Sequence, residues 1–509
     1  MATLHGIEVE PAVAAEPPAV ASAPPVYGRG HRRLLVLLSI VAIAFHGGVV
    51  YGWPSMRVML RRDDVLRPPR CPSYSGSLSA NATLGVCTEQ ELAFGYIYTT
   101  GAWSNQAGRL VIGIALDRFG PRVTAVSSAL AFGAGAAIFA MSMFASSAAG
   151  LVAGFFFVGA GGAGIQLSVQ SVAALFPQNR SLIMAMLSGA FQFASGVYVV
   201  FEVVHRQQQI ALRTMILLEC LVAGGISVLL WAALPDLPFG IAQVRTSRGL
   251  WATCKAAACR RPLQPSPQPS SQPSSQSSPQ FVLTMAPTDE GIDCDPSAKP
   301  KARSLRSLTF REQALSPECL LILTFFAIGA LQCQFTVATA GLQFERKGDL
   351  DGAATRHFGL CMVLVVLWTP ILGILTDRNG FGFTLTFVNS VLLISTACLL
   401  VPSLELTYFG SLAYSIGRVS LWASYFTYNA HVFGFQHFGK IVGCGMTLAA
   451  CFSLLQYPLL QLTVLALDGD FFVANILLGA LHCTAFATVP RLMKGAREAT
   501  RALSSDGSA

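Results

Sequence analysis

Charge is scarce in this sequence. Asp, Glu, Lys and Arg make up 12% of the 509 residues, whereas 53% are hydrophobic and the mean hydropathy is +0.55. A soluble chain carries about 25% charged residues. The shortage of charge therefore excludes an ordinary soluble globular domain.

Motifs of catalysis and metal binding are missing as well. None of the 13 cysteines has the spacing of a zinc site, and no Ser-His-Asp arrangement is evident. The stretch from Gly434 to Lys440 fits a phosphate-binding loop up to its lysine, but Ile441 replaces the Ser or Thr that holds Mg²⁺ and no strand precedes it. We therefore expect no enzyme, no catalytic residue, no metal site and no cofactor.

What the sequence does contain is a series of apolar segments. A helix crosses the hydrocarbon core with about 20 mostly apolar residues, and segments of that length predict an all-α integral membrane protein with twelve transmembrane helices. Glycine, at 46 residues, clusters inside them, and small residues let membrane helices approach closely, so we expect a tight bundle. The expected helices are residues 34–56, 92–114, 123–144, 148–172, 181–201, 212–234, 316–340, 354–375, 383–402, 405–430, 441–465 and 471–489.

The segments outside these helices divide the chain. Residues 1–33 lack a cleavable signal pattern and are expected to form a disordered N-terminus. Residues 235–315 form the only long internal loop, and the low-complexity run PLQPSPQPSSQPSSQSSPQ within it cannot bury a core, which indicates a linker. Six expected helices precede this linker (34–234), six follow it (316–489), and a polar tail (490–509) ends the chain.

A charged motif occurs twice, once after the second helix of each group of six. It reads GIALDRFG from Gly113 and GILTDRNG from Gly373. Two copies at matched positions indicate a duplicated carrier with two pseudo-symmetric halves. An Asp at a helix end can accept hydrogen bonds from backbone amides or pair with an Arg of the facing half, at about 1.5–3 kcal/mol per charged bond, so the motif predicts a gate. The alternative is a plain helix boundary. The expected gating residues are Gly113, Asp117, Arg118, Arg122, Gly373, Asp377 and Arg378, mainly those of the first copy, because Gly382 and Phe383 replace the basic residues that would end the second.

Basic residues predict the orientation. Arg29, Arg32 and Arg33 precede the first helix, and the linker and the tail are basic too, so all three are expected in the cytoplasm, with both termini. This inner-face charge accounts for the net charge of +8 without nucleic-acid binding. The plasma membrane is the expected location.

The loop after the first helix disagrees with that orientation. A chain that starts in the cytoplasm emerges outside after its first helix, which places the five arginines of this loop on the outer side. Two features outweigh them. Asn81-Ala-Thr83 is a glycosylation acceptor, used only on the outer or lumenal face. Cys71 and Cys87 flank it at a spacing that a disulfide closes, and disulfides persist in oxidising compartments. The alternatives are a chance sequon and free thiols. The five arginines are Arg57, Arg61, Arg62, Arg67 and Arg70.

Twelve helices in two sixes, a cytoplasmic link and the repeated loops resemble the major facilitator superfamily over residues 34–489. Its motif, Gly-x-x-x-Asp-Arg/Lys-x-Gly-x-Arg-Arg/Lys, is matched from Gly113 to Arg122, with Val123 in place of the last base. A narrower set of motifs resembles the solute-carrier 43 family, the L-type amino-acid transporters 3 and 4, with its nucleobase-transporting branch and related protist amino-acid transporters. These motifs are YGWPS from Tyr51, LFPQNRS from Leu175, QHFGK from Gln436 and SLLQYP from Ser453. The resemblance implies sodium-independent facilitated movement of large neutral amino acids by alternating exposure of a central site. We expect a monomer in the bilayer with a small-molecule substrate.

Polar residues in apolar helices are costly, so they are candidate substrate contacts between the halves. A lone guanidinium at Arg418 needs an anionic partner, and a substrate carboxylate supplies two oxygens for its fork. A pair with Glu219, or with carbonyls at the helix end, is the alternative. Trp103, Phe191 and Trp422 line an apolar pocket or are plain packing. The expected substrate-binding residues are His46, Asn105, Gln106, Arg109, Gln170, Gln192, Arg418, Tyr425 and Asn429.

The choice of substrate stays open. Arg109 and Arg418 favour a carboxylate over an uncharged nucleobase. Buried acids are few, mainly Glu202 and Glu219, which favours a uniporter and disfavours cationic substrates, because coupled carriers usually use buried carboxylates. Coupling through Glu219 or His46 is the alternative to a uniporter. A nucleobase carrier, a carrier of cationic or aromatic amino acids, and a sensor that signals without transport are also compatible with the sequence.

Overall fold

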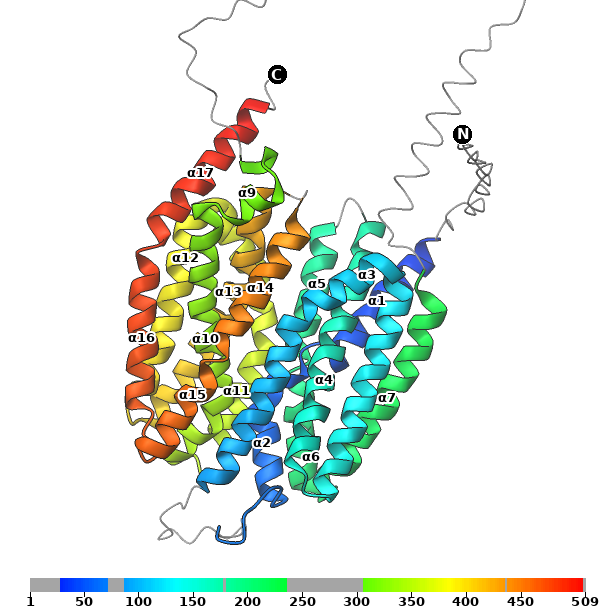
Figure 1. The fold of residues 1–509 in the computed structure, drawn as a ribbon, viewed down its shortest axis with the longest axis vertical. Helices are drawn as coiled ribbons and strands as arrows, with labels where there is room; N and C mark the ends of the chain where they lie inside the picture. Colours follow the sequence, from blue (N-terminus) through cyan, green and yellow to red (C-terminus); the bar gives the residue numbers. More distant parts are fainter. Residues whose placement is uncertain (1–27, 72–86, 177–179, 236–304, 435–436, 507–509) are drawn as a thin grey trace, which may run out of the picture.

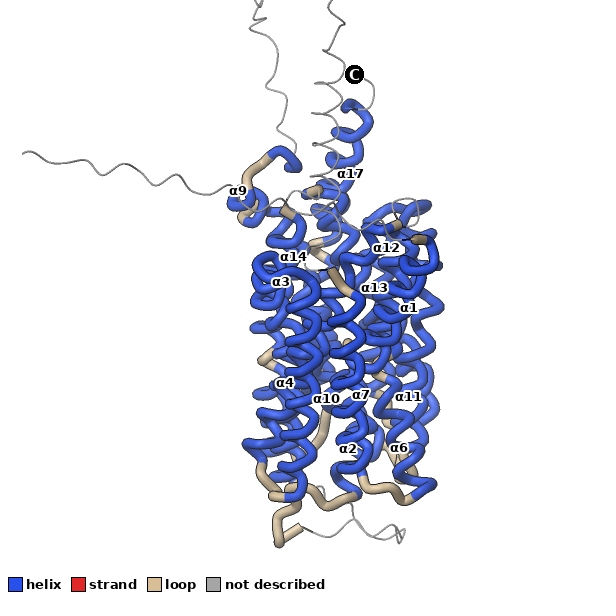
Figure 2. The backbone as a smooth tube through the Cα atoms, turned by 90° about the vertical axis from the view of Figure 1, so that its right-hand side faces the viewer, coloured by secondary structure: helices blue, strands red, loops and turns tan. Residues whose placement is uncertain are grey.

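The computed structural model describes residues 28–71, 87–176, 180–235, 305–434 and 437–506, and these form a bundle of helices (Figure 1). Among them no strand occurs (Figure 2). The helices of the earlier part of the chain are α1 Arg29–His46, η1 Val49–Gly52, α2 Trp53–Arg62, α3 Thr88–Phe144, α4 Ala148–Val169, η2 Gln170–Leu175, α5 Arg180–Phe193, α6 Gly196–Gln208 and α7 Leu212–Ala233.

The helices of the later part lie beside them, to the left in Figure 1. We call α1–α7 the first group and α9–α17 the second group. The second group consists of α9 Phe310–Ala314, α10 Pro317–Arg346, α11 Ala353–Leu364, η5 Val365–Trp368, α12 Thr369–Leu400, α13 Leu404–Phe433, α14 Phe438–Ser453, α15 Gln456–Gln461, η6 Leu462–Ala466, α16 Phe472–Phe486 and α17 Val489–Asp506, with the turn η4 Leu305–Ser307 before it. Most of the expected linker, residues 236–304, lies outside the described residues.

Within the described residues, eight helices are long and apolar enough to cross a membrane, or nine if the bent pair α16 and α17 is one span. All twelve expected segments lie in helical elements, but the stretch Ala353–Leu400 counts as one span. The early part of α3 and all of α13 are not among the eight. These two carry polar residues, including Arg109 and Arg418, that lower their hydropathy.

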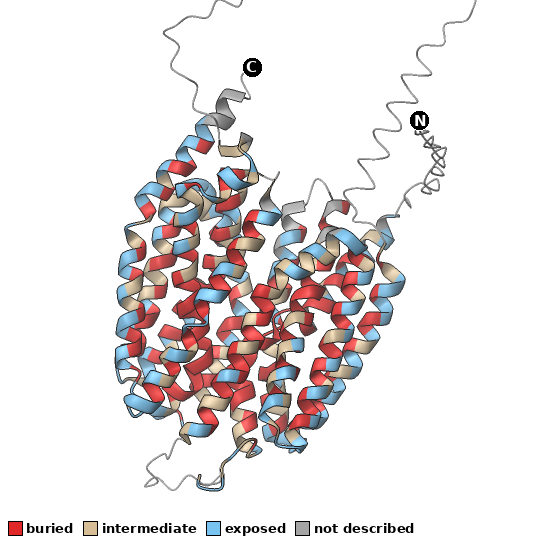
Figure 3. Cartoon of the chain, in the orientation of Figure 1, coloured by how far each residue is buried: buried red, intermediate tan, exposed pale blue. Residues whose placement is uncertain are grey.

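Large apolar side chains face outward from the bundle. Leu221 and Val228 on α7 are 71% and 68% exposed, and Figure 3 shows exposed positions along the outer faces while buried ones gather inside. Apolar patches of this kind are not stable in water and mark a surface that contacts something else. A lipid environment supplies that contact.

Glycine allows the closest helix approach, between α3 and α4. A Cβ placed on Gly154 would lie 2.6 Å from the backbone nitrogen of Phe139, and one on Gly161 would lie 2.6 Å from that of Phe132. No larger residue fits at either position without separating the helices. The expected tight packing through small residues is therefore present here.

Both copies of the Asp-Arg motif end in the same backbone conformation. Gly120 has φ 79° and ψ 172°, and Gly380 has φ 74° and ψ 174°. This is a region that glycine enters freely and other residues avoid. Each glycine redirects the chain from one helix into the next, within α3 and within α12.

The two ends of the bundle differ. The start of α1 and the end of α17 lie at the top of Figure 1, at what we call the termini end. The end of α2 lies at the opposite, disulfide end, where Cys71 is bonded to Cys87 just before α3 begins. Asn81, the expected glycosylation site, lies in the segment 72–86, outside the described residues.

The disulfide predicts a loss of stability when it is removed. The bond closes a loop with a sequence separation of 16, and a loop of that length contributes about 3 kcal/mol by restricting the unfolded chain. Replacing both Cys71 and Cys87 with serine should therefore lower the midpoint of thermal unfolding, measured on the purified protein in detergent. Serine at the exposed free cysteines Cys451 and Cys483 is the control and should leave the midpoint unchanged. An equal midpoint in both variants would contradict the prediction.

Candidate functional site

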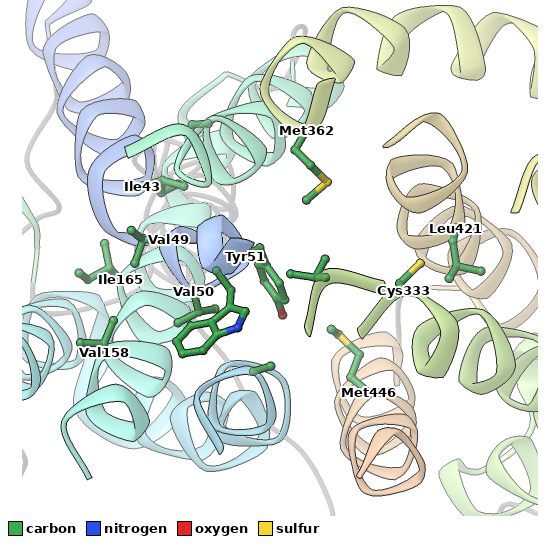
Figure 4. Packing of buried hydrophobic residues seen from close by; sticks show 14 of the residues in the cluster. Ile43, Val49, Val50, Tyr51, Val158, Ile165, Cys333, Met362, Leu421 and Met446 are labelled. Carbon is green, nitrogen blue, oxygen red and sulfur yellow. The ribbon is translucent and has the colours of Figure 1, made fainter. Parts of the chain in front are cut away.

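A break in the first spanning helix brings Tyr51 into the space between the two groups. α1 ends at His46, and Gly47 and Gly48 lead into the tight turn η1. A Cβ on Gly47 would lie 3.2 Å from the Phe191 ring, so the glycines allow α5 to approach the turn. Figure 4 shows the Tyr51 ring pointing from the first group toward Cys333 and Met446 of the second.

Asn105 holds this break in place. Its side-chain Nδ2 donates to the carbonyl of Gly47 at 3.1 Å and to that of Gly159 at 3.0 Å, and its Oδ1 accepts a bond from the Tyr51 hydroxyl at 3.4 Å. The amide thus ties α3 to η1 and α4. All these contacts lie within the first group.

Arg418, on α13, lies where the two groups meet. Its guanidinium carbon is 4.4 Å from the centre of the Tyr51 ring, and its Nη1 donates to Oε1 of Gln192 on α5 at 2.7 Å. The residue is 3% exposed. Among the described residues no ion pair joins it to Glu219, whose buried Oε1 has no hydrogen-bond partner there. The alternative of a structural pair with Glu219 is therefore wrong.

Arg109, on α3, lies near the ring of Phe191, which neighbours the Tyr51 ring. Its Nη2 donates to Oε1 of Gln166 at 2.7 Å, and its guanidinium carbon is 5.4 Å from the centre of the Phe191 ring. The Phe191 and Tyr51 ring centres are 5.9 Å apart. The Nε atom of Arg109 is buried and has no hydrogen-bond partner within the described part of the chain.

A buried arginine, Arg418, and a half-buried one, Arg109, therefore contact one pair of aromatic rings, and their hydrogen-bond partners in the described chain are neutral. Arginine stays charged in proteins, and a buried charge without a counter-charge costs several kcal/mol. The rings and the glutamine oxygens offset part of this cost. An anionic group that enters beside the rings would supply the missing charge.

Other residues expected at the site lie elsewhere. His46 is fully buried in the first group, where its Nδ1 is 3.1 Å from the carbonyl of Ala42 and its ring packs edge-on against Phe132. Tyr425 stacks on Phe326 inside the second group, with ring centres 4.1 Å apart. Asn429 donates to the carbonyl of Tyr425.

Tyr425 and Asn429 share a helix face with Arg418, but they sit two and three turns along α13. That displacement takes them away from the arginine and into packing with α10. Gln170 is half-buried at the start of η2. The structure thus brings Arg109, Gln192 and Arg418 together around Tyr51 and Phe191, and separates them from His46, Gln170, Tyr425 and Asn429.

Gln106 faces the second group. It lines a small space together with Trp103 of α3, Gln334 of α10 and Gln456 of α15. Sequence reasoning missed Gln334, although a glutamine in the apolar helix 316–340 meets the same criterion that selected Gln106. The Tyr98 hydroxyl on α3 donates to Gln334 Oε1 at 2.6 Å, which links the two groups.

Charged residues join the two groups at the disulfide end. Arg57 of α2 donates to both oxygens of Glu91 on α3, at 2.7 and 2.5 Å, and its Nη1 donates to Glu345 on α10 at 2.8 Å. Arg61 forms a further ion pair with Glu345. Arg57 is buried, and the side chains of Glu91 and Glu345 are 5% and 15% exposed. We call these four residues the Arg57 network.

The Asp-Arg motif, from which we expect a gate, makes contacts inside its own group among the described residues. Arg122 donates from Nε to the carbonyl of Leu234, within the first group, at 2.6 Å. Arg118 lies over its neighbour Phe119, while Asp377 and Arg378 are exposed. The Asp117 side chain lies outside the described residues. The ion pairs that join the groups in the described ranges lie at the disulfide end, so the structure is closed there.

A model of the Major Facilitator Superfamily matches residues 73–455. This chain belongs to the major facilitator superfamily. The superfamily protein is 22% identical over 465 residues to equilibrative nucleobase transporter 1 of Bos taurus, covering 86% of this chain and 91% of that one. It is 22% identical over 528 residues to large neutral amino acids transporter small subunit 3 of Homo sapiens, covering 89% and 92%. The xylose transporter XylE from E. coli, solved in an inward-open conformation, shares the fold with a TM-score of 0.56 and 13% identity, covering 91% and 95%.

The resemblance stated from the sequence motifs is thereby confirmed, and with it an all-helical membrane transporter. Both branches named there, nucleobase and amino-acid carriers, are represented among the relatives. In a transporter of this superfamily, contacts between the groups must form and break as the site changes sides. The Arg57 network joins the two groups in the state that the structure shows. Arg57 and Arg61 are two of the five arginines that oppose the charge rule, and the network gives them a structural role.

Proposed function

We propose that this transporter carries large neutral amino acids by sodium-independent facilitated diffusion, through alternating exposure of a site between two six-helix halves. One observation carries the proposal. Arg418, which is buried, and Arg109, which is half-buried, lie beside the Tyr51 and Phe191 rings without an acidic partner in the described chain. A substrate carboxylate matches the fork of a guanidinium and supplies the missing charge.

The two halves in this proposal are residues 34–234 and 316–489, each with six of twelve membrane helices. Their matched details support it. Gly120 and Gly380 turn the chain identically, and Ser147 and Ser403 cap the helices that follow, accepting from Gly150 and Leu406 backbone nitrogens at 3.3 Å. We further propose a monomer in the plasma membrane, with both termini in the cytoplasm and the disulfide end outside.

The chemistry near the rings supports a neutral side chain on the substrate. Met362 and Met446 lie with Tyr51 in the packing between the groups (Figure 4), and methionine adapts to apolar groups of different shape. No carboxylate is among the partners of Arg109 or Arg418 in the described residues, so a second positive charge on the substrate would meet only arginines. Cationic amino acids are therefore disfavoured.

A nucleobase carrier is the second candidate. The amides of Gln106, Gln334 and Gln456 gather in one space and offer donors and acceptors to a flat, uncharged ring. The similarity to the nucleobase transporter of Bos taurus supports the same candidate.

Uptake of a labelled panel tests the choice. Cells expressing the protein should accumulate leucine, phenylalanine and tyrosine well above cells without it, equally with and without sodium and at neutral and mildly acidic pH. Arginine and adenine should enter no faster than in the control cells. Adenine uptake without leucine or phenylalanine uptake would favour the second candidate. A protein that reaches the surface and carries none of the panel would favour a sensor.

A further inference from the structure

Four polar side chains from both groups meet beside Tyr51, the residue whose ring Arg418 lies over. Trp103 and Gln106 come from α3, Gln334 from α10 and Gln456 from the start of α15, and together they line one small space. α3 packs against α14, α15 and α10 here, so the space lies on the boundary between the groups. The three glutamines are 1–3% exposed. We call these four residues the amide cluster.

Each member of the amide cluster leaves a buried polar atom without a partner. The atoms are Trp103 Nε1, Gln106 Oε1, Gln334 Nε2 and Gln456 Oε1. Turning an amide exchanges its oxygen and nitrogen, but each glutamine still offers one donor end and one acceptor end, and the indole offers only a donor. The cluster is therefore a set of two donors and two acceptors that contains no charge.

Packing alone does not account for this arrangement. More than about 90% of buried polar groups in proteins are hydrogen-bonded, and an orphaned one costs free energy. Apolar residues of similar size would fill the same space without that cost. Four orphaned atoms converging at a boundary that must open during transport indicate that a transient partner completes them.

Gln334 connects this boundary to the closure of the disulfide end. Its Oε1 accepts from Tyr98 across the groups at 2.6 Å, and Glu345 lies on the same face of α10, three turns further toward the disulfide end. Movement of α10 away from α3 at that end separates Gln334 from Tyr98. A partner bound at the cluster is thus exchanged as the groups move.

We propose that the amide cluster is a second recognition point of the transporter, which binds a neutral donor–acceptor group of the substrate, an N–H beside a C=O or its equivalent. Such a group both donates a hydrogen bond to an amide and accepts one from it. An aliphatic side chain does neither and leaves all four atoms of the cluster without a hydrogen-bond partner. Two sources have this chemistry: the carboxamide of glutamine or asparagine, and the lactam edge of a nucleobase such as hypoxanthine. For the amino-acid source the inference rests on the proposed function.

Replacing Gln106 or Gln456 with leucine tests the proposal. Each change removes an atom that has no partner in the described structure, so surface expression and thermal stability should not fall. Uptake of glutamine or hypoxanthine at low concentration should fall about tenfold, the effect of losing one hydrogen bond, while leucine uptake stays within about twofold. The readout is therefore a ratio between substrates, which a general loss of structure does not move.

Gln343→Leu is the matched control. Gln343 is also a buried glutamine of α10, but its Nε2 donates to Thr339 and its Oε1 accepts from Asn475, so the ratio between substrates should not change. Equal losses for glutamine and leucine in the Gln106 and Gln456 variants would overturn the proposal, as would no change for any substrate, the result expected if the amide cluster only packs the boundary between the groups. A parent protein that carries leucine but neither glutamine nor hypoxanthine would also overturn it. Loss of hypoxanthine uptake in a protein that carries no amino acid would support the cluster and refute the proposed amino-acid function.

Discussion

Replacing Arg418 with lysine is expected to lower leucine and phenylalanine uptake about 100-fold at low substrate concentration. Lysine keeps the positive charge but loses the planar fork that binds two carboxylate oxygens, and hydrogen bonds to charged groups are worth about 1.5–3 kcal/mol each. The shorter side chain also loses the position over the Tyr51 ring and the bond to Gln192. Initial uptake rates in expressing cells, scaled to surface protein, give the measurement.

The control for this variant is Arg497→Lys, at an exposed position on α17, which should leave uptake unchanged. The double variant Arg109→Lys and Arg418→Lys tests whether the two residues act on one group of the substrate. If both guanidiniums hold one carboxylate, their effects are not additive, because either loss already spoils the same contact. Normal leucine uptake by the Arg418→Lys protein at normal surface expression would refute the role of Arg418.

The sequence predicted the fold more completely than the site. Apolar segments of membrane length are local signals, and they placed all twelve expected segments in helical elements, although they did not predict the break after α1 or the turns at Gly120 and Gly380. Arg418 could be selected for a similar reason, because a charge inside an apolar helix is conspicuous without any knowledge of its neighbours. Its partner could not be selected, since Gln192 lies 226 positions away and nothing in either segment specifies the contact.

The Arg57 network shows the same limit more sharply. Arg57 and Glu345 are 288 positions apart, and each stands close to the end of an apolar segment, where charged residues are ordinary. Only the packing of α2 against α10 makes them a buried pair. The arginines after the first helix conflicted with the charge rule, because that rule only counts basic residues. It takes no account of an acidic partner from the other group that neutralises some of them. The gate expected from the Asp-Arg motif stays a prediction, and the ion pairs that join the groups in the described chain lie at the disulfide end.

Replacing Arg57 with glutamine is expected to open the disulfide end. The change leaves Glu91 and Glu345 buried beside each other without their shared cation, and removing one partner of a buried ion pair costs about 3–5 kcal/mol. The loss of the Arg57–Glu345 pair falls on the closed state alone, because Arg57 and Glu91 belong to the same group and stay together when the groups separate, so the population should shift toward a state open at this end. A cysteine introduced at Ala338 reports the shift, because Ala338 lies on the face of α10 between Gln334 and Glu345 and is 9% exposed.

The measurement is the rate at which a membrane-impermeant thiol reagent labels Ala338→Cys in intact cells, compared with the same cells expressing the protein without that cysteine. Adding Arg57→Gln should raise the rate about tenfold or more, and Glu345→Gln should do the same. Arg67→Gln is the matched control, because Arg67 lies near the same end but is paired with Asp64 in an exposed bridge at 3.3 Å. Pro69→Cys, labelled in parallel, shows that the reagent reaches this end. If it is labelled and Arg57→Gln leaves the labelling of Ala338→Cys unchanged, the Arg57 network does not hold this end closed.

Uptake should fall in the Arg57→Gln protein even though its disulfide end opens more readily. A carrier completes its cycle only by visiting both states, so a large bias toward either one makes the opposite step slow. The Arg57 network faces no matching set of cross-links at the termini end among the described residues, where Asp377 and Arg378 are exposed. A substrate that bridges Arg418 of the second group and Arg109 of the first draws the groups together whichever end is open. Binding at the centre is therefore expected to favour a state closed at both ends, and saturating leucine should lower the rate at which Ala338→Cys is labelled in the otherwise unaltered protein.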